Sequence, residues 1–261
     1  MRITTLNCNG IRSAAKKGLF DWLPARRLDF LLLQETKCQR SDLDGSDVHF
    51  PGGWHAFFNS AERKGYSGVA IYTRKEPEAV LDKLGNAEFD TEGRYLELRY
   101  GNLSVVSLYL PSGSAGPERQ ASKDRFLEFF LPLLRKWRAS GRDYVIGGDW
   151  NIAHTRLDIK NWRSNQKNSG FLPHERAWFD AVFGTDSGLG WVDAYRTLYP
   201  AAEGEGYTWW SNRGNAWANN VGWRIDYQVV TPGLRGALKE AAVFKEQRFS
   251  DHAPLTVDYG S

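Results

Sequence analysis

Near the end of the chain stands the stretch Phe249-Ser250-Asp251-His252-Ala253-Pro254-Leu255, in which an acid and an imidazole adjoin in a short loop before an apolar strand. Three other apolar segments end in a similar way, in Asn7-Cys8-Asn9, in Gln34-Glu35-Thr36-Lys37 and in Gly148-Asp149-Trp150-Asn151. A further segment reads Arg224-Ile225-Asp226-Tyr227. Carboxylates, carboxamides and one imidazole recur where strands end, and in sheet proteins ligands bind beyond strand ends. This pattern predicts a metal-dependent active site.

The rest of the chain predicts many strands and fewer helices. Val, Ile, Leu and Tyr gather in short segments bounded by Gly, Asn, Asp or Pro, a composition typical of strands. The predicted strands are 2–7, 28–34, 54–58, 67–73, 94–100, 103–109, 143–148, 224–231 and 253–259. The predicted helices are 11–25, 119–139, 173–183 and 191–198. Tyr100-Gly101-Asn102 favours a tight hairpin turn.

No linker, low-complexity segment or run of one charge sign divides the chain, and its 261 residues suit one large domain. We therefore predict a single domain over 1–261, of the α/β (α+β) class, with two packed sheets and helices outside. Each half begins with a strand that runs into an asparagine, Asn7 in the first and Asn151 in the second, and closes on a strand pair. This similarity is a weak sign that the two halves are related by an internal duplication.

Composition narrows the class of protein. A net charge of +3 permits binding to phosphate backbones without requiring it. The 11 Trp are numerous, and some of these rings are expected to line surfaces. Two cysteines form no disulfide framework, and no apolar run approaches the ~18 residues of a membrane span. Because the first strand begins at Arg2, no signal peptide is expected, and we predict a soluble, cytosolic protein.

The acidic motifs carry the chemistry. Glu35 ends an apolar strand, where a carboxylate needs a cation or donors, and Mg²⁺ needs only one or two carboxylates. Asp149 and Asn151 follow two glycines and can point into one cleft, where they would orient a water or a phosphate oxygen. The alternatives are a capping or salt-bridged Glu35 and a simple Asx turn at Asp149.

Asp251 and His252 are adjacent, and neighbours on a strand face opposite sides, so they are not expected to pair. The imidazole then needs another acceptor to fix its tautomer, and Asp226, inside an apolar strand, is the candidate. A purely structural histidine is the alternative.

The inventory of groups indicates the reaction type. Enzymes lower barriers by ~8–23 kcal/mol, and one general base supplies only about 3–5 kcal/mol of that. With acids, amides, a Tyr and a His but no plausible Ser or Cys nucleophile, the chain predicts metal-assisted attack of water on a phosphate ester. Segments 160–171 and 63–68 are basic or rich in amides, and 207–213 and 221–224 interleave aromatic and cationic residues, as expected for contacts with phosphates and bases.

Together these motifs resemble the exonuclease III family of DNA-repair nucleases, within the endonuclease/exonuclease/phosphatase superfamily, over essentially the whole chain. The motifs that carry the resemblance are Leu6–Arg12, Leu33–Lys37, Tyr66–Ala70, Ser107–Pro111, Gly148–His154, Gly222–Tyr227 and Ser250–Leu255.

The resemblance implies a four-layered sandwich of two mixed β-sheets flanked by helices. It implies a Mg²⁺ or Mn²⁺ site at Glu35, with Asn7 and Asp251 close by and with Asp149 and Asn151 as further candidate ligands. Asp149 would activate or orient the water, Asn151 and Tyr109 would hold the scissile phosphate, and His252, oriented by Asp226, would stabilise the developing charge. Which residue is the general base stays open.

For the substrate, the resemblance implies double-stranded, damaged DNA. Candidate contacts are Asn9, Lys37, Tyr66, Asn161, Asn165 and Asn168, together with Trp209, Trp223 and Ile225, which fall where the family has an apolar pocket for a baseless sugar. The implied activities are 3′→5′ exonuclease, removal of 3′-phosphates or other 3′-blocking groups, and incision 5′ to abasic sites. We expect a monomer without an obligate protein partner or a membrane, in the cytoplasm of a bacterial-type cell and associated with the nucleoid.

Two alternatives belong to other classes. One is a non-catalytic regulator on the same fold that binds nucleic acid or RNA–protein complexes, and such relatives have lost part of the site. Here the acids, amides and histidine of the motifs are all present. The other is a phosphatase for inositol lipids or sphingomyelin, which the aromatic and basic segments and the lack of a membrane element disfavour.

Overall fold

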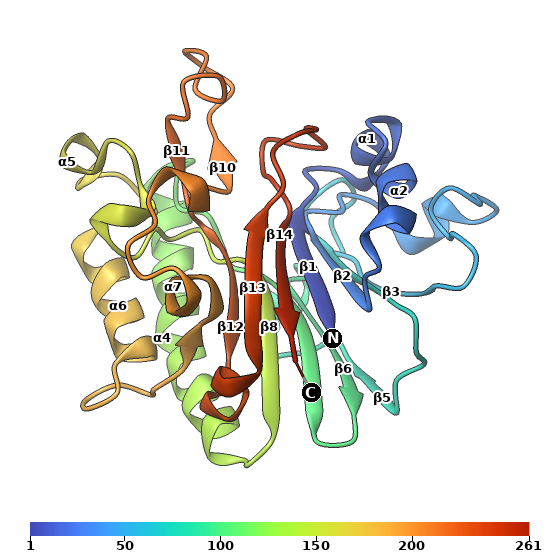
Figure 1. The fold of residues 1–261 in the computed structure, drawn as a ribbon, viewed down its shortest axis with the longest axis horizontal. Coiled ribbons are helices and arrows are strands. Elements are labelled where there is room, and N and C mark those ends of the chain that lie inside the picture. The colour runs from blue at the N-terminus through green and yellow to red at the C-terminus, as the bar shows by residue number, and fades with distance from the viewer. Residues whose placement is uncertain (261) are drawn as a thin grey trace.

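The computed structural model describes residues 1–260, which form two six-stranded sheets packed against each other (Figure 1). Helices cover the outer face of each sheet, so the protein has four layers. The predicted two-sheet α/β sandwich is therefore confirmed. None of the helices in residues 1–260 combines the length and apolar character that crossing a membrane requires.

The first sheet has the order β13–β14–β1–β2–β4–β3. Its strands are β1 (Arg2–Asn7), β2 (Phe30–Gln34), β3 (His55–Asn59), β4 (Val69–Thr73), β13 (Leu238–Val243) and β14 (Leu255–Tyr259). Strands β1 and β2 are parallel, and all other neighbours in this sheet are antiparallel.

The second sheet has the order β5–β6–β7–β8–β12–β9. Its strands are β5 (Ala79–Leu81), β6 (Tyr95–Tyr100), β7 (Leu103–Tyr109), β8 (Asp143–Asp149), β9 (Val192–Asp193) and β12 (Asp226–Val230). Here β7 and β8 are the one parallel pair, again in the middle. Read from β9 to β5, the second sheet has the same succession of antiparallel and parallel neighbours as the first sheet. This agreement supports the weak sequence similarity between the two halves.

This topology brings the polar motifs together. The carboxyl ends of the parallel strands are Asn7, Gln34, Tyr109 and Asp149, and parallel neighbours end on the same edge of a sheet. Because β12 runs antiparallel to β8, its first residue, Asp226, pairs with the last residue of β8, Asp149. At this edge the short hairpin of β10 (Trp209–Trp210) and β11 (Gly222–Trp223) also projects (Figure 1).

The helices are α1 (Ile11–Lys16), α2 (Leu19–Trp22), α3 (Ala87–Asp90), α4 (Pro117–Ala139), α5 (Trp162–Asn165), α6 (Pro173–Phe183) and α7 (Ala194–Leu198). On α4, Phe126, Phe130 and Leu134 are completely buried against the second sheet, each burial contributing about 1.5–3 kcal/mol. Branched residues of both sheets, such as Leu32 and Val145, fill the layer between them.

Several predicted boundaries were wrong. The predicted helix 11–25 is divided into α1, α2 and a 3₁₀ turn, because Gly18 is left-handed (φ 87°) and Pro24 lacks an N–H. Residues 192–193 of the predicted helix 191–198 pair with β12 instead. Strand β13 was missed because its Leu-Lys-Glu-Ala-Ala sequence favours a helix, and pairing with β14 overrides that preference.

Candidate active site

One cavity of about 740 Å³ opens at the edge where the parallel strands end. It brings together residues from both sheets and from the loops between them. The predicted site residues that line it are Glu35, Tyr109, Asp149, Asn151, Asn168, Trp209, Trp223, Ile225, Asp251 and His252. Residues predicted from seven separate segments of the sequence therefore share one cavity.

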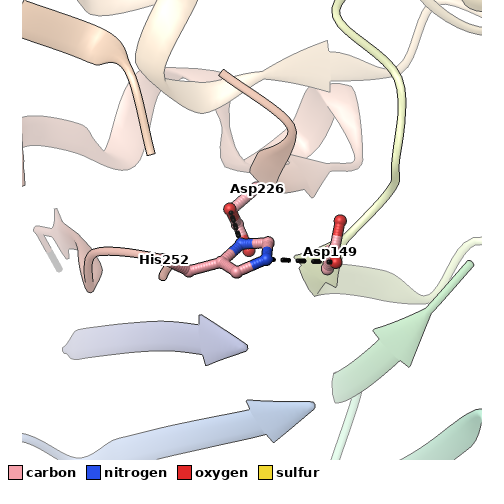
Figure 2. Close-up of side chains that lie close together, drawn as sticks. All are labelled: Asp149, Asp226 and His252. Atoms are coloured by element: carbon pink, nitrogen blue, oxygen red, sulfur yellow. Dashed lines mark hydrogen bonds and ion pairs between the residues drawn. The ribbon is translucent and has the colours of Figure 1, made fainter. Parts of the chain in front are cut away.

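On one side of the cavity, His252 lies between two carboxylates (Figure 2). Its Nδ1 is 2.8 Å from Oδ2 of Asp226, and its Nε2 is 3.8 Å from Oδ2 of Asp149. All three side chains are buried. The imidazole Nδ1 therefore bonds Asp226, the partner that the sequence suggested, and not the adjacent Asp251.

The backbone holds this group in place. Asp226 is fixed because its N–H and that of Ile225 both donate to Oγ1 of the buried Thr208. Asp149 accepts a hydrogen bond from Asn7 Nδ2 at Oδ2 (2.9 Å) and from the Asn151 N–H at Oδ1 (2.9 Å). Thr208 was not a predicted site residue, because a threonine inside an aromatic segment carries no signal of this role.

Burial and charge set the ionisation of the group. Burial raises the pKa of Asp149 to about 7, and the charge of Asp226 adds to the effect although His252 opposes it. Burial disfavours the charged form of His252, but Asp226 and then Asp149 outweigh it and raise its pKa to about 10. At neutral pH the imidazole is therefore a cation, and Asp149 can exchange a proton.

Asp149, Asp226 and His252 offer ligand atoms within 4.8 Å of one another, a spacing that suits a metal ion. A metal would need the neutral imidazole. Here His252 carries a raised pKa and both of its ring nitrogens face carboxylates. Both ring nitrogens are therefore already engaged by carboxylates, although Oδ1 of Asp226 is buried without a hydrogen-bond partner. We place the candidate cation site on the opposite side of the cavity, where the carboxylates have lowered pKa values.

That opposite side is built around Glu35. Its Oε1 accepts hydrogen bonds from Asn7 Nδ2 and from the Tyr109 hydroxyl, both at 2.8 Å, and its Oε2 lies 2.8 Å from Lys37 Nζ. Burial opposes the charge of Glu35, but these donors outweigh it and lower the pKa. Burial raises the pKa of Tyr109, which keeps its hydroxyl protonated as a donor.

Asp251 completes this side. Its Oδ1 accepts from Asn9 Nδ2 (2.9 Å) and its Oδ2 from Trp209 Nε1 (3.1 Å). Burial opposes its charge, but His252 and these two donors lower the pKa. Lys37 Nζ donates to Asn9 Oδ1 at 2.5 Å, so the predicted contacts Asn9 and Lys37 bridge the two carboxylates.

This side of the cavity fits a hard divalent cation. Two carboxylates with lowered pKa, Glu35 and Asp251, face one cavity, and carboxylate oxygens are the ligands that Mg²⁺ prefers. Asn7 was predicted as a further ligand. In this structure its Nδ2 donates to Glu35 and Asp149, while its Oδ1 accepts one hydrogen bond, from the Asn9 N–H.

The wall of the cavity is aromatic where β10 pairs with β11. Trp209 and Trp223 are cross-strand partners, with ring centroids 6.0 Å apart and planes at 84°. They pack with Ile225 and Phe171 in a small apolar cluster. Trp210 stands in the segment 207–213 that was expected to contact phosphates or bases, but it is 1 % exposed and its Nε1 donates to Asn220.

Five predicted contacts do not line the main cavity, namely Asn9 and Lys37, whose bonds are given above, and Asn161, Asn165 and Tyr66. Asn161 and Asn165 line a neighbouring cavity of about 360 Å³ behind the two tryptophans. Tyr66 belongs to a separate cavity, where its hydroxyl donates to Glu92 and accepts from Arg94 and Arg119. Conversely, Lys167 and Arg213 line the main cavity and were not singled out, although both stand in segments predicted to contact phosphates or bases.

Fold and site together define a phosphodiester hydrolase built on two sheets. The sequence profile of the Endonuclease/Exonuclease/phosphatase family matches residues 4–252, and the chain belongs to that family.

Relatives and solved structures narrow the similarity to the exonuclease III and AP endonuclease group. The chain is 35 % identical to the exodeoxyribonuclease of Bacillus subtilis over 260 residues, covering 98 % of both chains. It is 34 % identical to the DNA repair nuclease APEX1 of Danio rerio, covering 98 % of this chain and 81 % of that protein. The 3′-5′ exonuclease NExo of Neisseria meningitidis has a similar structure, with a TM-score of 0.89 and 27 % identity over all of both chains. An AP endonuclease of Archaeoglobus fulgidus gives 0.88 and 27 %, again over all of both chains.

Proposed function

We propose that this protein is a Mg²⁺-dependent DNA-repair nuclease that acts on double-stranded DNA. Its activities would be 3′→5′ exonuclease, removal of 3′-phosphates or other 3′-blocking groups, and incision 5′ to abasic sites. The observation that carries the proposal is the division of one cavity into a side of low-pKa carboxylates and a side with a buried Asp–His–Asp triad. The names of the relatives support the same substrate and reaction.

In the proposed reaction a water oxygen bonds to phosphorus, and the bond from phosphorus to O3′ breaks. Asp149 orients this water and takes its proton, a role suited to a carboxyl whose pKa is raised to about 7. The His252 imidazolium, held by Asp226, stabilises negative charge as it develops. Asn151 and the Tyr109 hydroxyl hold the phosphate, and the released O3′ oxygen takes a proton from solvent to become a 3′-hydroxyl.

Glu35 and Asp251 would hold the divalent cation, Mg²⁺ or Mn²⁺. Bound there, the cation would neutralise charge on the phosphate oxygens. Lys37 Nζ lies 2.8 Å from Glu35, so an approaching cation or phosphate would compete with this lysine, and its ammonium would be available for a phosphate oxygen.

The aromatic wall suits a sugar that has lost its base. Trp209, Trp223 and Ile225 offer an apolar surface beside Asp149 and Asn151 in the same cavity. A normal nucleotide enters only if its base leaves the stack, which costs a few kcal/mol and is easiest at damaged or unpaired positions. This difference supports selection of abasic sites and frayed 3′ ends.

The non-catalytic alternative requires an incomplete site. Every predicted catalytic group except Asp226 lines the cavity, and Asp226 bonds His252. No observation therefore favours this alternative. Both cysteines, Cys8 and Cys38, are free and buried, which is consistent with the reducing cytoplasm that we propose as the protein's setting. We expect the protein to act as a monomer.

The test is cleavage of three matched duplexes, one with an abasic site, one with a 3′-phosphate and one with a recessed 3′-hydroxyl, at one salt concentration. Cleavage that stops with a chelator and returns with Mg²⁺ or Mn²⁺ is the expected result. Salt must be fixed because it alone changes phosphate-driven binding by orders of magnitude. If none of the three duplexes is cut with either metal, the proposed function is wrong.

A further inference from the structure

A buried ion pair lies beneath the cavity and is not part of the catalytic set. Lys123, in the second turn of α4, places Nζ 2.6 Å from Oε1 of Glu175, the third residue of α6, and both side chains are 0 % exposed. Two buried charges gain little stability over well-packed apolar residues. The role of this buried pair therefore depends on which parts of the structure it holds in place.

Lys123 holds the backbone of Asn151. Its Nζ donates a second hydrogen bond, of 2.8 Å, to the Asn151 carbonyl oxygen. Asn151 has φ 52°, a left-handed conformation that is uncommon outside glycine and needs support from its surroundings. Its Nδ2 donates to the Leu110 carbonyl, which leaves Oδ1 as the end of the amide that can meet a ligand in the cavity.

Glu175 holds the other wall of the cavity. Its Oε2 accepts hydrogen bonds from the Gly170 N–H (2.7 Å) and the Leu172 N–H (2.9 Å). Gly170 ends the Lys167–Gly170 part of the cavity lining, and it is left-handed, with φ 92°. A Cβ at Gly170 would come within 3.1 Å of the Asn151 carbonyl oxygen and 3.2 Å of the Trp223 ring.

The two contacts meet in one place. The Asn151 carbonyl, the Gly170 backbone and the Trp223 ring are in close approach, and the Ala153 N–H also donates to the Gly170 carbonyl. The Lys123–Glu175 pair joins α4 and α6 to this junction, and Gln120 of α4 also donates to Glu175 (3.2 Å). The pKa of Lys123 is lowered by burial, with Glu175 and then Asp149 acting against that effect, so the ammonium also lies within the electrostatic reach of Asp149.

We propose that the Lys123–Glu175 pair is a positioning element that fixes Asn151 and the 167–170 segment relative to each other. The side-chain amide of Asn151, which faces the phosphate, and the 167–170 loop, which faces the DNA, are then held as one unit. Neither residue touches substrate in this proposal, and both act through Asn151 and Gly170. The idea rests on the proposed function for its effect on rate, but its structural part stands without it.

The kinetic test is a double-mutant cycle. Lys123→Met alone would leave the Glu175 carboxylate buried without a cation, although Gln120 still donates to it. The variant to measure is therefore Lys123→Met with Glu175→Gln, in which the amide oxygen introduced at this position still accepts from Gly170 and Leu172. A displacement near 1 Å costs up to about 100-fold in rate, so we expect kcat to fall by about 10–100-fold with KM little changed. In an Asn151→Ala background the same pair of changes should alter kcat by no more than about twofold, the scatter of such cycles.

Arg125→Met is the matched control, because Arg125 lies on the same helix and its ion pair with Glu88 is exposed. It should leave kcat and KM unchanged. Thermal unfolding establishes that each variant is folded. If the folded Lys123→Met, Glu175→Gln variant keeps kcat within about twofold of the parent protein, or if its effect multiplies fully with that of Asn151→Ala, the proposal is overturned.

Hydrogen exchange gives a readout that needs no activity. In the Lys123→Met, Glu175→Gln variant we expect faster amide exchange in residues 149–153, and in Glu175→Ala faster exchange at Gly170 and Leu172 as well, with neither change in Arg125→Met. Unchanged exchange in both segments would refute the positioning role. An inactive parent protein would instead contradict the proposed function and leave the exchange result to decide this inference.

Discussion

The two sides of the cavity use the same kinds of side chain and reach opposite electrostatic states. Glu35 and Asp251 lie among donors, including Lys37 and Trp209, and their pKa values are lowered. Asp149 is also hydrogen-bonded, but it is completely enclosed beside Asp226, and its pKa is raised to about 7.

The difference shows that the groups around a carboxylate, and not the type of side chain, determine its ionisation and therefore its role. A carboxylate that stays ionised at any physiological pH suits a cation, and one that titrates near neutrality suits proton transfer. Asn7 stands between the two sides, because one Nδ2 donates to both Glu35 and Asp149. The comparison therefore predicts that changes on the two sides have different signatures.

The largest effect is expected at Asp149. In Asp149→Asn the amide cannot take a proton from water, so kcat on an abasic duplex should fall by about 10²–10⁴-fold at saturating metal. Steady-state cleavage rates measure the change. Asp180→Asn is the control, because the Asp180 side chain is 74 % exposed and bonds only His154 among its charged neighbours. A loss at Asp149 no greater than that of this control would remove Asp149 from the chemistry.

A smaller and different effect is expected at Glu35. Glu35→Gln removes one carboxylate charge from the cation side, so the Mg²⁺ concentration at half-maximal rate should rise by more than about tenfold. His252→Gln should lower kcat while that concentration stays nearly constant. A titration of rate against Mg²⁺ separates the two, and direct Mn²⁺ binding provides a second readout. If His252→Gln moves the metal requirement as far as Glu35→Gln does, the buried triad is a metal site and the division of the cavity is wrong.

Much of this site could be predicted from the sequence because most of its residues lie at the ends of strands. Each apolar strand that ran into polar residues, as at Glu35 and Asp149, delivered those residues to one edge, since parallel pairing fixes where strands end. The His252–Asp226 pair also followed from local geometry, because adjacent residues on a strand cannot face each other. Local pattern and tertiary position agree at these residues.

The rest depended on packing that no local pattern reveals. Strand β13 has the composition of a helix and is a strand because β14 offers an edge. Tyr66 stands in a basic segment typical of phosphate contacts, yet Arg94 and Glu92 hold it in a separate cavity. The Lys123–Glu175 pair looks like two ordinary surface charges of helices, and its burial follows only from how α4 and α6 meet.

The smallest expected effect concerns stability and pH in the metal-free protein. Asp149 has a folded pKa of about 7 against an ordinary value of 3.8, so its contribution to stability is fully present below pH 3.8 and is lost as pH rises through 7. Asp149→Asn lacks this titration. The melting temperature of the variant relative to that of the parent protein should therefore shift upward by a few degrees between about pH 5 and pH 8.

The measurement is thermal unfolding in chelator across that pH range, with Asp180→Asn as a control whose difference from the parent should stay flat. His252 adds little to the slope, because its folded pKa of about 10 keeps it protonated across the window, and its titration in the unfolded chain is common to both proteins. A difference that shrinks with rising pH would mean that Asp149 is stabilised as an anion. It would then resemble Glu35, and the two sides of the cavity would no longer differ in charge.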